Sequence, residues 1–218
     1  MKAVVLLSGG IDSAAALYWC REQGWDVYAL TFDYELEQSP DLRAAKRVAQ
    51  AASVRHHLVV DSSFYKELKG SPSSYRGTIV DTDTGVSQAY VPGRNIVFFG
   101  MAAAYAETLG ARKVVSGHNL GDAERFPDAS GRFVEAFNKL LRLGLKTGRG
   151  TNSIEVVAPF AKLSKTEVLR QAARLGVPLK DTWSCYSNGK KPCGVCYGCR
   201  ARRQAFVELG AEDPTSVR

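Results

Sequence analysis

The chain has 218 residues, of which 45% are apolar and 23% charged, enough for the core of one ordinary domain and too apolar for intrinsic disorder. No apolar run approaches the ~20 residues needed to cross a bilayer. The first ten residues lack a signal-peptide pattern, so we expect a cytoplasmic protein with no membrane partner. The 29 basic and 22 acidic residues give a net charge of +7, which favours anionic partners such as nucleotides, phosphates or nucleic acid.

Apolar runs alternate with helical periodicity along most of the chain. We predict strands over 3–7, 27–32, 58–60, 114–115 and 154–157, and helices over 13–22, 41–52, 95–109, 133–143 and from Ser164 to about Leu175. Asn95 is the expected cap and Gly110 the stop of the long third helix, while Ser164 and Glu167 form a capping box. Repeated strand–helix–strand units require parallel pairing, so the predicted fold class is α/β, with a doubly wound, Rossmann-like parallel sheet.

Two segments interrupt this alternation. Residues 70–94 are rich in Ser, Thr, Gly and Pro, so we expect a lid or binding loop there. Residues 181–203 contain four of the five cysteines and are too short to fold without a staple. The expected organisation is therefore an α/β domain over 1–180 with a cysteine-bearing subregion, 181–218, packed on it.

The sharpest motif joins the first strand to the first helix and is Leu7-Ser8-Gly9-Gly10-Ile11-Asp12-Ser13. Gly9 and Gly10 lack a Cβ, so the backbone can turn tightly and bring its amides against a phosphate. Free N–H groups at the start of a helix attract the same anion. Asp12 then orients the loop, acts on a nucleophile or holds a divalent cation. The plain alternative is a turn capped by Asp12 or Ser13, but the strand before it and the helix after it favour a nucleotide site.

Further polar residues follow the other predicted strands and helix starts. Asp33, beside Thr31 and Tyr34 at the end of the second strand, can accept from a ribose hydroxyl or an adenine amine, or can be an ordinary turn residue. Arg94, just before a helix, can neutralise charge on a leaving pyrophosphate, or can be solvated. Lys165 lies in a first helical turn, where a cation is unfavourable, so we expect an anionic partner such as phosphate.

The cysteines near the end of the chain have the spacing Cys185-x7-Cys193-x2-Cys196-x2-Cys199. Four thiolates with no open position predict structural zinc, with an iron–sulfur cluster and free or redox thiols as alternatives. We expect Gly194 and Gly198 to supply sharp turns, and Arg200, Arg202 and Arg203 to offset the thiolate charge. Cys20 is predicted to be a packed core residue.

Together these motifs resemble one family. Ser8–Ser13 resembles the SGGxDS loop of the PP-loop ATP pyrophosphatases. The remaining motifs match the 7-cyano-7-deazaguanine synthases of the queuosine pathway (the QueC/ExsB family) nearly end to end: Leu30-Thr31-Phe32-Asp33-Tyr34, Val91-Pro92-Gly93-Arg94-Asn95, Phe126-Pro127-Asp128, Leu163-Ser164-Lys165-Thr166-Glu167, Ser184-Cys185-Tyr186 and Cys193-Gly194-Val195-Cys196-Tyr197-Gly198-Cys199-Arg200.

The resemblance implies a fold, a reaction and a set of site residues. The fold would be of the adenine nucleotide alpha hydrolase-like type. The reaction would be an ATP-dependent C–N ligation, in which 7-carboxy-7-deazaguanine and ammonia give the 7-nitrile through adenylate and amide intermediates. ATP, Mg²⁺ and structural zinc would be the cofactors, and a homodimer is the arrangement implied. The implied catalytic residues are Asp12, Arg94 and Lys165, and the implied nucleotide contacts are Leu7, Ser8, Gly9, Gly10, Ile11, Asp12, Ser13, Thr31, Asp33, Tyr34 and Arg94.

The substrate pocket is less well defined. In the family, the stretch after the fourth strand borders the deazaguanine, so His118, Phe126 and Asp128 are the implied substrate contacts. Asp128 would pair with the guanine-like edge and Phe126 would stack on the ring. His118 is either a base or a strand-end histidine bonded to backbone. Residues 122–130 depart from the Tyr-Ser-Gly-Tyr-Pro-Asp-Cys-Arg run expected in bacterial members, which leaves the exact substrate open.

Three other functions fit part of the sequence. A divergent relative would hand the same adenylate to another amine, such as a protein N-terminus or a nucleobase. A tRNA-thiolating PP-loop enzyme would need reactive cysteines near the loop and an RNA-binding domain, which we do not find in the sequence. Zinc-ribbon binding of nucleic acid would fit the charge and the basic stretch Lys139, Arg142, Lys146 and Arg149, but it would leave Ser8–Ser13 unexplained, so we do not expect a nucleic-acid partner.

Overall fold

A five-stranded parallel sheet forms the centre of the computed structural model, which describes residues 1–33, 39–66, 90–150 and 152–215. The strands are β1 (Lys2–Leu6), β2 (Asp26–Asp33), β3 (His56–Asp61), β4 (Lys113–Val115) and β5 (Glu155–Val157). Their order is β3-β2-β1-β4-β5, and every neighbouring pair is parallel. The order reverses between β1 and β4, which is where open α/β sheets bind their ligands, beyond the carboxyl ends of the strands.

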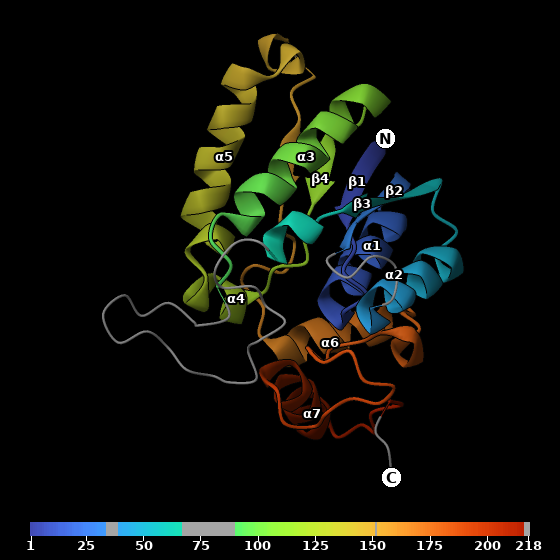
Figure 1. Cartoon of the computed structure of the whole chain (residues 1–218). Coiled ribbons are helices and arrows are strands. Elements are labelled where there is room, and N and C mark those ends of the chain that lie inside the picture. Colours follow the sequence, from blue (N-terminus) through green and yellow to red (C-terminus); the bar gives the residue numbers. More distant parts are fainter. Residues whose placement is uncertain (34–38, 67–89, 151, 216–218) are drawn as a thin grey trace.

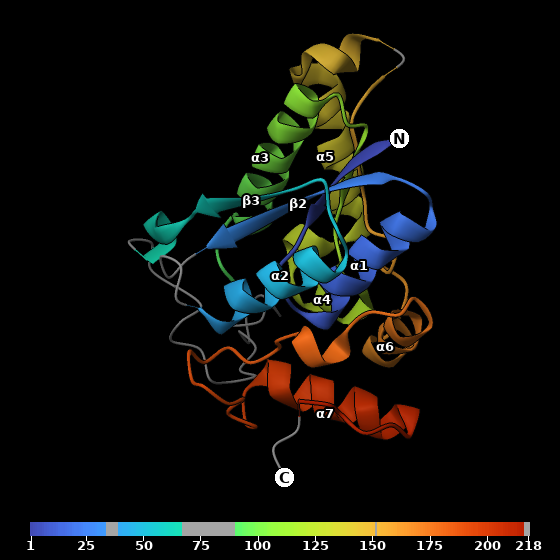
Figure 2. The same ribbon diagram turned by 90° about the vertical axis from the view of Figure 1, so that its right-hand side faces the viewer.

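Helices cover both faces of the sheet (Figures 1 and 2). On one face lie α1 (Ile11–Glu22), α2 (Pro40–Ala51), α6 (Lys165–Arg174) and α7 (Tyr197–Leu209), and on the other lie α3 (Arg94–Leu109) and α5 (Gly131–Gly144). Alternate residues of β1 serve the two layers, since Val5 packs under α1 and Val4 under α3. A strand buried on both faces needs a continuous apolar run, which explains the Ala3–Leu7 sequence. The predicted α/β, doubly wound architecture is confirmed.

Several element boundaries differ from those predicted. The first helix begins at Ile11, two residues early, with Gly10 in the cap position. Asn95 is not a cap: α3 begins at Arg94, and Gly93 precedes it in a left-handed conformation. Gly110, at φ +64°, ends α3 as expected. The Ser164–Glu167 capping box is present.

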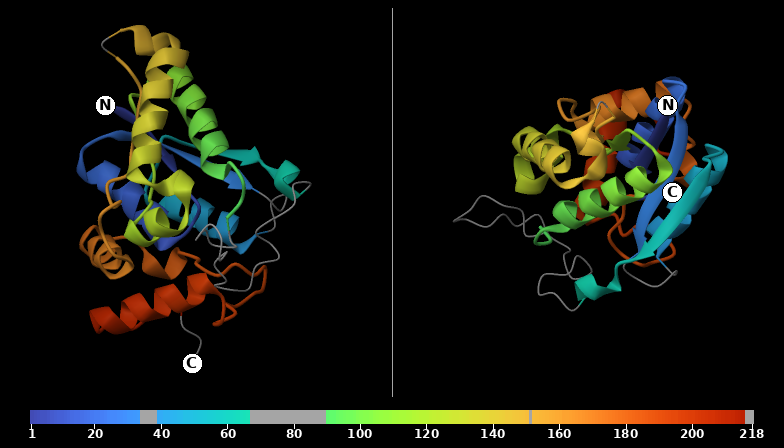
Figure 3. Two further views of the ribbon diagram at one scale, coloured as in Figure 1. Left: turned by 90° about the vertical axis from the view of Figure 1, so that its left-hand side faces the viewer. Right: turned by 90° about the horizontal axis from the view of Figure 1, so that it is seen from above.

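Short elements and the last helix were not predicted from periodicity. They are α4 (Leu120–Arg125), the 3₁₀ turns Ser63–Lys66, Pro127–Ala129, Lys146–Arg149 and Leu179–Asp181, and α7. Helix α7 lies against α6. It lies below the sheet in Figure 1 and in the left-hand view of Figure 3. A division of the chain at residue 180 stays a prediction, and most of the expected 70–94 loop lies outside the described residues. Among the described helices, none has both the length and the apolar character that crossing a bilayer requires.

Candidate functional site

The loop between β1 and α1 is ordered by its own serine side chains. Ser13 Oγ accepts from the Ser8 N–H at 3.2 Å, lies 3.1 Å from Ser8 Oγ and donates to the Gly10 carbonyl at 3.1 Å. Gly10 occupies the cap position without a side chain. Asp12 and Ser13 therefore lie in the first helical turn and not at the cap. The first N–H groups of α1 have no intrahelical acceptor, which makes this loop a suitable anion site.

Two glycines allow close approaches that set the position of the loop. Gly9 has φ +82°, and a Cβ there would lie 2.3 Å from the Asp41 carbonyl oxygen and 2.7 Å from the Ala45 nitrogen in α2. A Cβ on Gly117, just after β4, would lie 2.7 Å from the Asp12 carbonyl oxygen. The loop is thus held between the start of α2 and the end of β4. Gly117 was missed by the sequence analysis, and its place directly after a buried strand is the signal that identifies it.

Asp12 and Lys165 meet beside this loop. Lys165 Nζ donates to Asp12 Oδ2, and the two side chains are 24% and 22% exposed. The other carboxylate oxygen, Asp12 Oδ1, is buried and has no hydrogen-bond partner in the described part of the chain. A buried anionic oxygen without a donor suits a cation or a ligand donor. The anionic partner of Lys165 in this structure is a carboxylate, so its contact with phosphate stays a prediction.

His118 joins this cluster from the segment after β4. Its Nδ1 is buried, and none of the described residues bonds to it. Burial lowers the pKa of His118, Asp122 opposes this effect and Arg94 reinforces it. The imidazole is therefore neutral at neutral pH, and it can accept or donate a hydrogen bond without adding charge to the site.

Hydrogen bonds to the next residue, Asn95, fix the position of Arg94. The Asn95 N–H donates to Asp128 Oδ2 at 3.0 Å, and Asn95 Nδ2 donates to the Asp128 carbonyl at 3.1 Å. All four groups are buried, so they fix the first turn of α3 and with it Arg94. Asp128 thus has a structural role that the sequence did not suggest. Its pairing with a guanine-like edge, which would use the other carboxylate oxygen, stays a prediction.

The end of β2 is only partly available to a ligand. Thr31 Oγ1 donates to the Leu7 carbonyl at 2.5 Å and lies 2.7 Å from His57 Nε2. The hydroxyl is therefore used within the protein, and a nucleotide contact from Thr31 would come from its main chain. Asp33 is buried at the carboxyl edge, opposite Asp61 of β3. Tyr34 lies outside the described residues.

The end of α4 contacts the C-terminal subregion. The Arg125 guanidinium lies 3.6 Å from the ring centroid of Tyr197, the first residue of α7, and Arg125 Nε donates to the Gly121 carbonyl at 2.9 Å. Phe126 follows, half-buried, with its ring centroid 5.4 Å from the same guanidinium. Stacking of Phe126 on a substrate ring stays a prediction.

The four C-terminal cysteines form one cluster. The sulfurs of Cys185, Cys193, Cys196 and Cys199 all lie within 4.8 Å of one another, and all four are free thiols. Backbone N–H groups point at the sulfurs, among them those of Ser187 and Cys193 toward Cys185 Sγ at 3.3 and 3.2 Å. Tetrahedral zinc with Zn–S bonds of about 2.3 Å needs sulfurs about 3.8 Å apart, so the cluster fits a metal ion with little adjustment.

Two expectations about this region were wrong. Gly194 has φ +74° and makes a turn as expected, but Gly198 does not. A Cβ on Gly198 would lie 1.9 Å from the Ser184 carbonyl oxygen, so this glycine is needed for close packing. Arg202 does not offset thiolate charge, because its guanidinium is paired with Asp213. Cys20 is fully buried in the core, as predicted.

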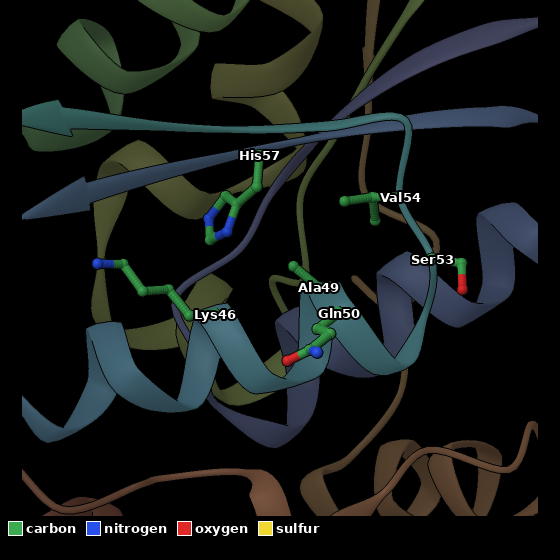
Figure 4. A pocket seen from close by; sticks show the side chains of 6 residues that line it. All are labelled: Lys46, Ala49, Gln50, Ser53, Val54 and His57. Atoms are coloured by element: carbon green, nitrogen blue, oxygen red, sulfur yellow. The ribbon is translucent and has the colours of Figure 1, made fainter.

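A shallow pocket of about 390 Å³ lies between α2 and β3 (Figure 4). It is lined by Lys46, Ala49, Gln50, Ser53, Val54 and His57. Burial first, and the charge of Lys46 second, lower the pKa of His57 to about 4. Since Thr31 uses its proton for Leu7, the His57 Nε2 must carry the proton of their hydrogen bond. His57, on the edge strand β3, thus donates to the Thr31 hydroxyl of the neighbouring strand β2.

Comparison with solved structures defines the class of fold. The chain is similar to NMN synthetase from Francisella tularensis, with a TM-score of 0.53 and 16% identity, covering 97% of this chain and 77% of that one. It is also similar to a 4-thiouridine synthetase in a complex with RNA and bound ATP, with a TM-score of 0.50 and 22% identity, covering 96% and 51%. The fold is that of the PP-loop synthetases.

Sequence comparison then defines the family. The model of "Queuosine biosynthesis protein QueC" matches residues 2–210. The chain is 40% identical to a 7-cyano-7-deazaguanine synthase of Nostoc sp. (strain PCC 7120), covering 98% of this chain and 96% of the relative. It is 39% identical to one of Caldicellulosiruptor bescii, with the same two coverages. The chain belongs to the QueC family, a family of enzymes, and the resemblance identified from its motifs is confirmed.

Proposed function

We propose that this enzyme is an ATP-dependent ligase that converts 7-carboxy-7-deazaguanine and ammonia to 7-cyano-7-deazaguanine for 7-deazapurine biosynthesis. The family and its named relatives support the product. The ATP requirement is supported by three features that meet at the switch point: a glycine loop before a helix, an Asp12 Oδ1 without a partner among the described residues, and Lys165 beside it. Backbone amides, a lysine and a free carboxylate oxygen are the groups that bind a triphosphate and its counterion.

The proposed chemistry uses two adenylations, first of the carboxylate and then of the amide formed from it. A carboxylate oxygen attacks the α-phosphorus of ATP, pyrophosphate leaves, and ammonia displaces AMP to give the amide. A second adenylation on the amide oxygen, with loss of a proton, allows elimination of AMP to the nitrile. The loop amides and Ser13 would hold the phosphates, while Arg94 and Lys165 would offset the charge that grows on the leaving pyrophosphate. The neutral His118, whose Nδ1 has no partner among the described residues, would take the proton that ammonia or the amide loses.

Two metal ions are proposed in different roles. Mg²⁺ neutralises phosphate charge when bound, and Asp12 Oδ1, a hard oxygen without a donor, fits it. Zinc would be held by Cys185, Cys193, Cys196 and Cys199, whose soft sulfurs and full set of four protein ligands suit a structural ion. The ammonia, the deazaguanine acid and a homodimeric assembly complete the proposal.

The direct test is mass spectrometry of the products formed from 7-carboxy-7-deazaguanine, ammonium, MgATP and purified protein. We expect free nitrile, AMP and pyrophosphate, and we expect Asp12→Ala to lose AMP formation while keeping the far-UV spectrum of the parent. AMP release without free nitrile would favour transfer of the adenylate to a different amine. No ATP turnover under any of these conditions would refute the proposal.

A further inference from the structure

The segment 182–185 connects the cysteine cluster to the nucleotide loop. The Trp183 N–H donates to the Gly9 carbonyl at 2.8 Å, and its indole Nε1 donates to the Cys185 carbonyl at 2.8 Å. Gly9 is thus held on one side by the start of α2 and on the other by a residue more than 170 positions away. Because glycine rotates freely, this carbonyl needs such a partner to keep one orientation.

Arg202 fixes the residue that precedes this contact. It is only 4% exposed, and it makes two bonds to the Asp213 carboxylate at 2.7 and 2.9 Å. Its Nη1 donates to Thr182 Oγ1 at 2.8 Å and its Nη2 to the Leu179 carbonyl at 3.1 Å. The Thr182 hydroxyl in turn donates to Leu179 at 2.7 Å. The planar guanidinium therefore fixes three separate groups in one arrangement.

Stability alone does not explain why the Arg202–Asp213 pair is buried. A buried ion pair gains little over well-packed apolar residues, because both charges lose their hydration. What the pair provides is geometry: it locks Thr182, and the next N–H along the chain is the one that holds Gly9. Fixing the Gly9 carbonyl also fixes the opposite side of the same peptide group, the Gly10 N–H, which lies inside the loop, 3.4 Å from Ser8 Oγ.

We propose that Arg202 is a positioning residue for the nucleotide loop, acting through Thr182 and the Trp183–Gly9 hydrogen bond. The proposal rests on the proposed function in one respect, namely that the loop binds ATP. It gives the C-terminal subregion a part in nucleotide affinity in addition to any structural role of its metal. A residue that acts through a chain of packed contacts typically changes affinity by ~0.5–2 kcal/mol, or roughly twofold to thirtyfold.

Calorimetric titration of zinc-loaded protein with MgATP tests this proposal. Arg202→Lys removes the fork of donors, and Thr182→Val removes the hydroxyl at nearly constant volume. We expect both to raise the Kd for MgATP by about twofold to thirtyfold, and Thr182→Ser to restore the Kd of the parent. Arg174→Lys is the matched control, because Arg174 makes a similar two-bond pair with Glu22 at a distant, exposed site. Leu141→Ala controls for lost stability, since it weakens the core on the opposite face of the sheet.

The outcomes separate the two proposals. If the parent protein binds no MgATP, the proposed function fails. Leu141→Ala is expected to keep the Kd for MgATP within twofold of the parent value. If the parent binds MgATP and both Arg202→Lys and Thr182→Val also stay within twofold of it, the positioning role is overturned and the proposed function stands. If Arg202→Lys does not fold, the comparison of Thr182→Val with Thr182→Ser decides alone.

Discussion

Replacing Gly9 by alanine tests how tightly the loop is confined. Gly9 and Gly176 both have left-handed backbones, at φ +82° and +74°, so alanine at either position costs ~1–2 kcal/mol. Around Gly176 a Cβ would meet nothing within 4 Å. At Gly9 it would lie 2.3 Å from the Asp41 carbonyl oxygen and must move to beyond 3.0 Å, a shift of at least about 0.7 Å. Overpacking of this kind adds about 1–3 kcal/mol.

We therefore expect Gly9→Ala to lower the free energy of unfolding by about 2–5 kcal/mol and Gly176→Ala by about 1–2 kcal/mol. Displacing a binding group by close to 1 Å costs up to about a hundredfold, so Gly9→Ala should also weaken MgATP binding more than tenfold, while Gly176→Ala leaves it unchanged. Urea unfolding and calorimetric titration of both variants measure these effects. Equal losses of stability and equal nucleotide affinity in the two variants would refute the packing argument.

Three more predictions follow from individual contacts. A Cβ on Gly117 would lie 2.7 Å from the Asp12 carbonyl oxygen, although the Gly117 backbone is not left-handed. Gly117→Ala should therefore move Asp12 and reduce AMP formation at least tenfold, and unchanged turnover would contradict this prediction. Cys193→Ser with Cys196→Ser should abolish stoichiometric zinc and lower the melting temperature, as elemental analysis and calorimetry would show; full zinc content would disprove the ligand set. His57 takes up a proton near its ordinary pKa of 6.5 in the unfolded chain, but only at a pKa of about 4 in the folded chain. The free energy of unfolding should therefore fall by about 1–2 kcal/mol from pH 6.5 to 4, after allowance for partial exposure. Urea midpoints of His57→Gln should fall less over this range than those of the parent, and an identical decline in both would exclude His57 as the cause.

The sequence predicted the architecture because local signals and burial agree. Strands such as Ala3–Leu7 are apolar on both faces, and the Ser164 capping box and Gly110 stop are local devices that tertiary contacts did not override. Asn95 failed as a cap because a distant residue, Asp128, binds both its N–H and its side chain. Helix α7 was missed because the cysteine and arginine pattern of 193–203 was interpreted as metal chemistry, although Tyr197–Leu209 has helical spacing.

The candidate site was predictable to the extent that it lies in one short motif. The loop residues were found from Ser8–Ser13 alone, whereas the partner of Asp12 is 153 residues away and that of Gly9 is farther still. No local pattern encodes such contacts. Gly117 has a local signal, its place directly after a buried strand, whereas Trp183 acts through a backbone hydrogen bond to Gly9 that a single sequence does not reveal.

From the charges around His118 we predict that ATP affinity depends on Mg²⁺. Three carboxylates (Asp12, Asp122 and Asp128) and the cation Arg94 act on this histidine, while Lys165 is paired with Asp12 and Arg125 with Asp122. Three anions against three cations leave the site without net positive charge before the nucleotide arrives, so the site by itself does not neutralise a bare triphosphate. We expect ATP to bind weakly in EDTA and at least tenfold more tightly with Mg²⁺. Asp12→Asn removes one of the anions and the proposed Mg²⁺ ligand, so the ATP affinity of this variant should depend much less on Mg²⁺ in the same titration. An equal dependence in parent and variant would show that Asp12 does not hold the ion.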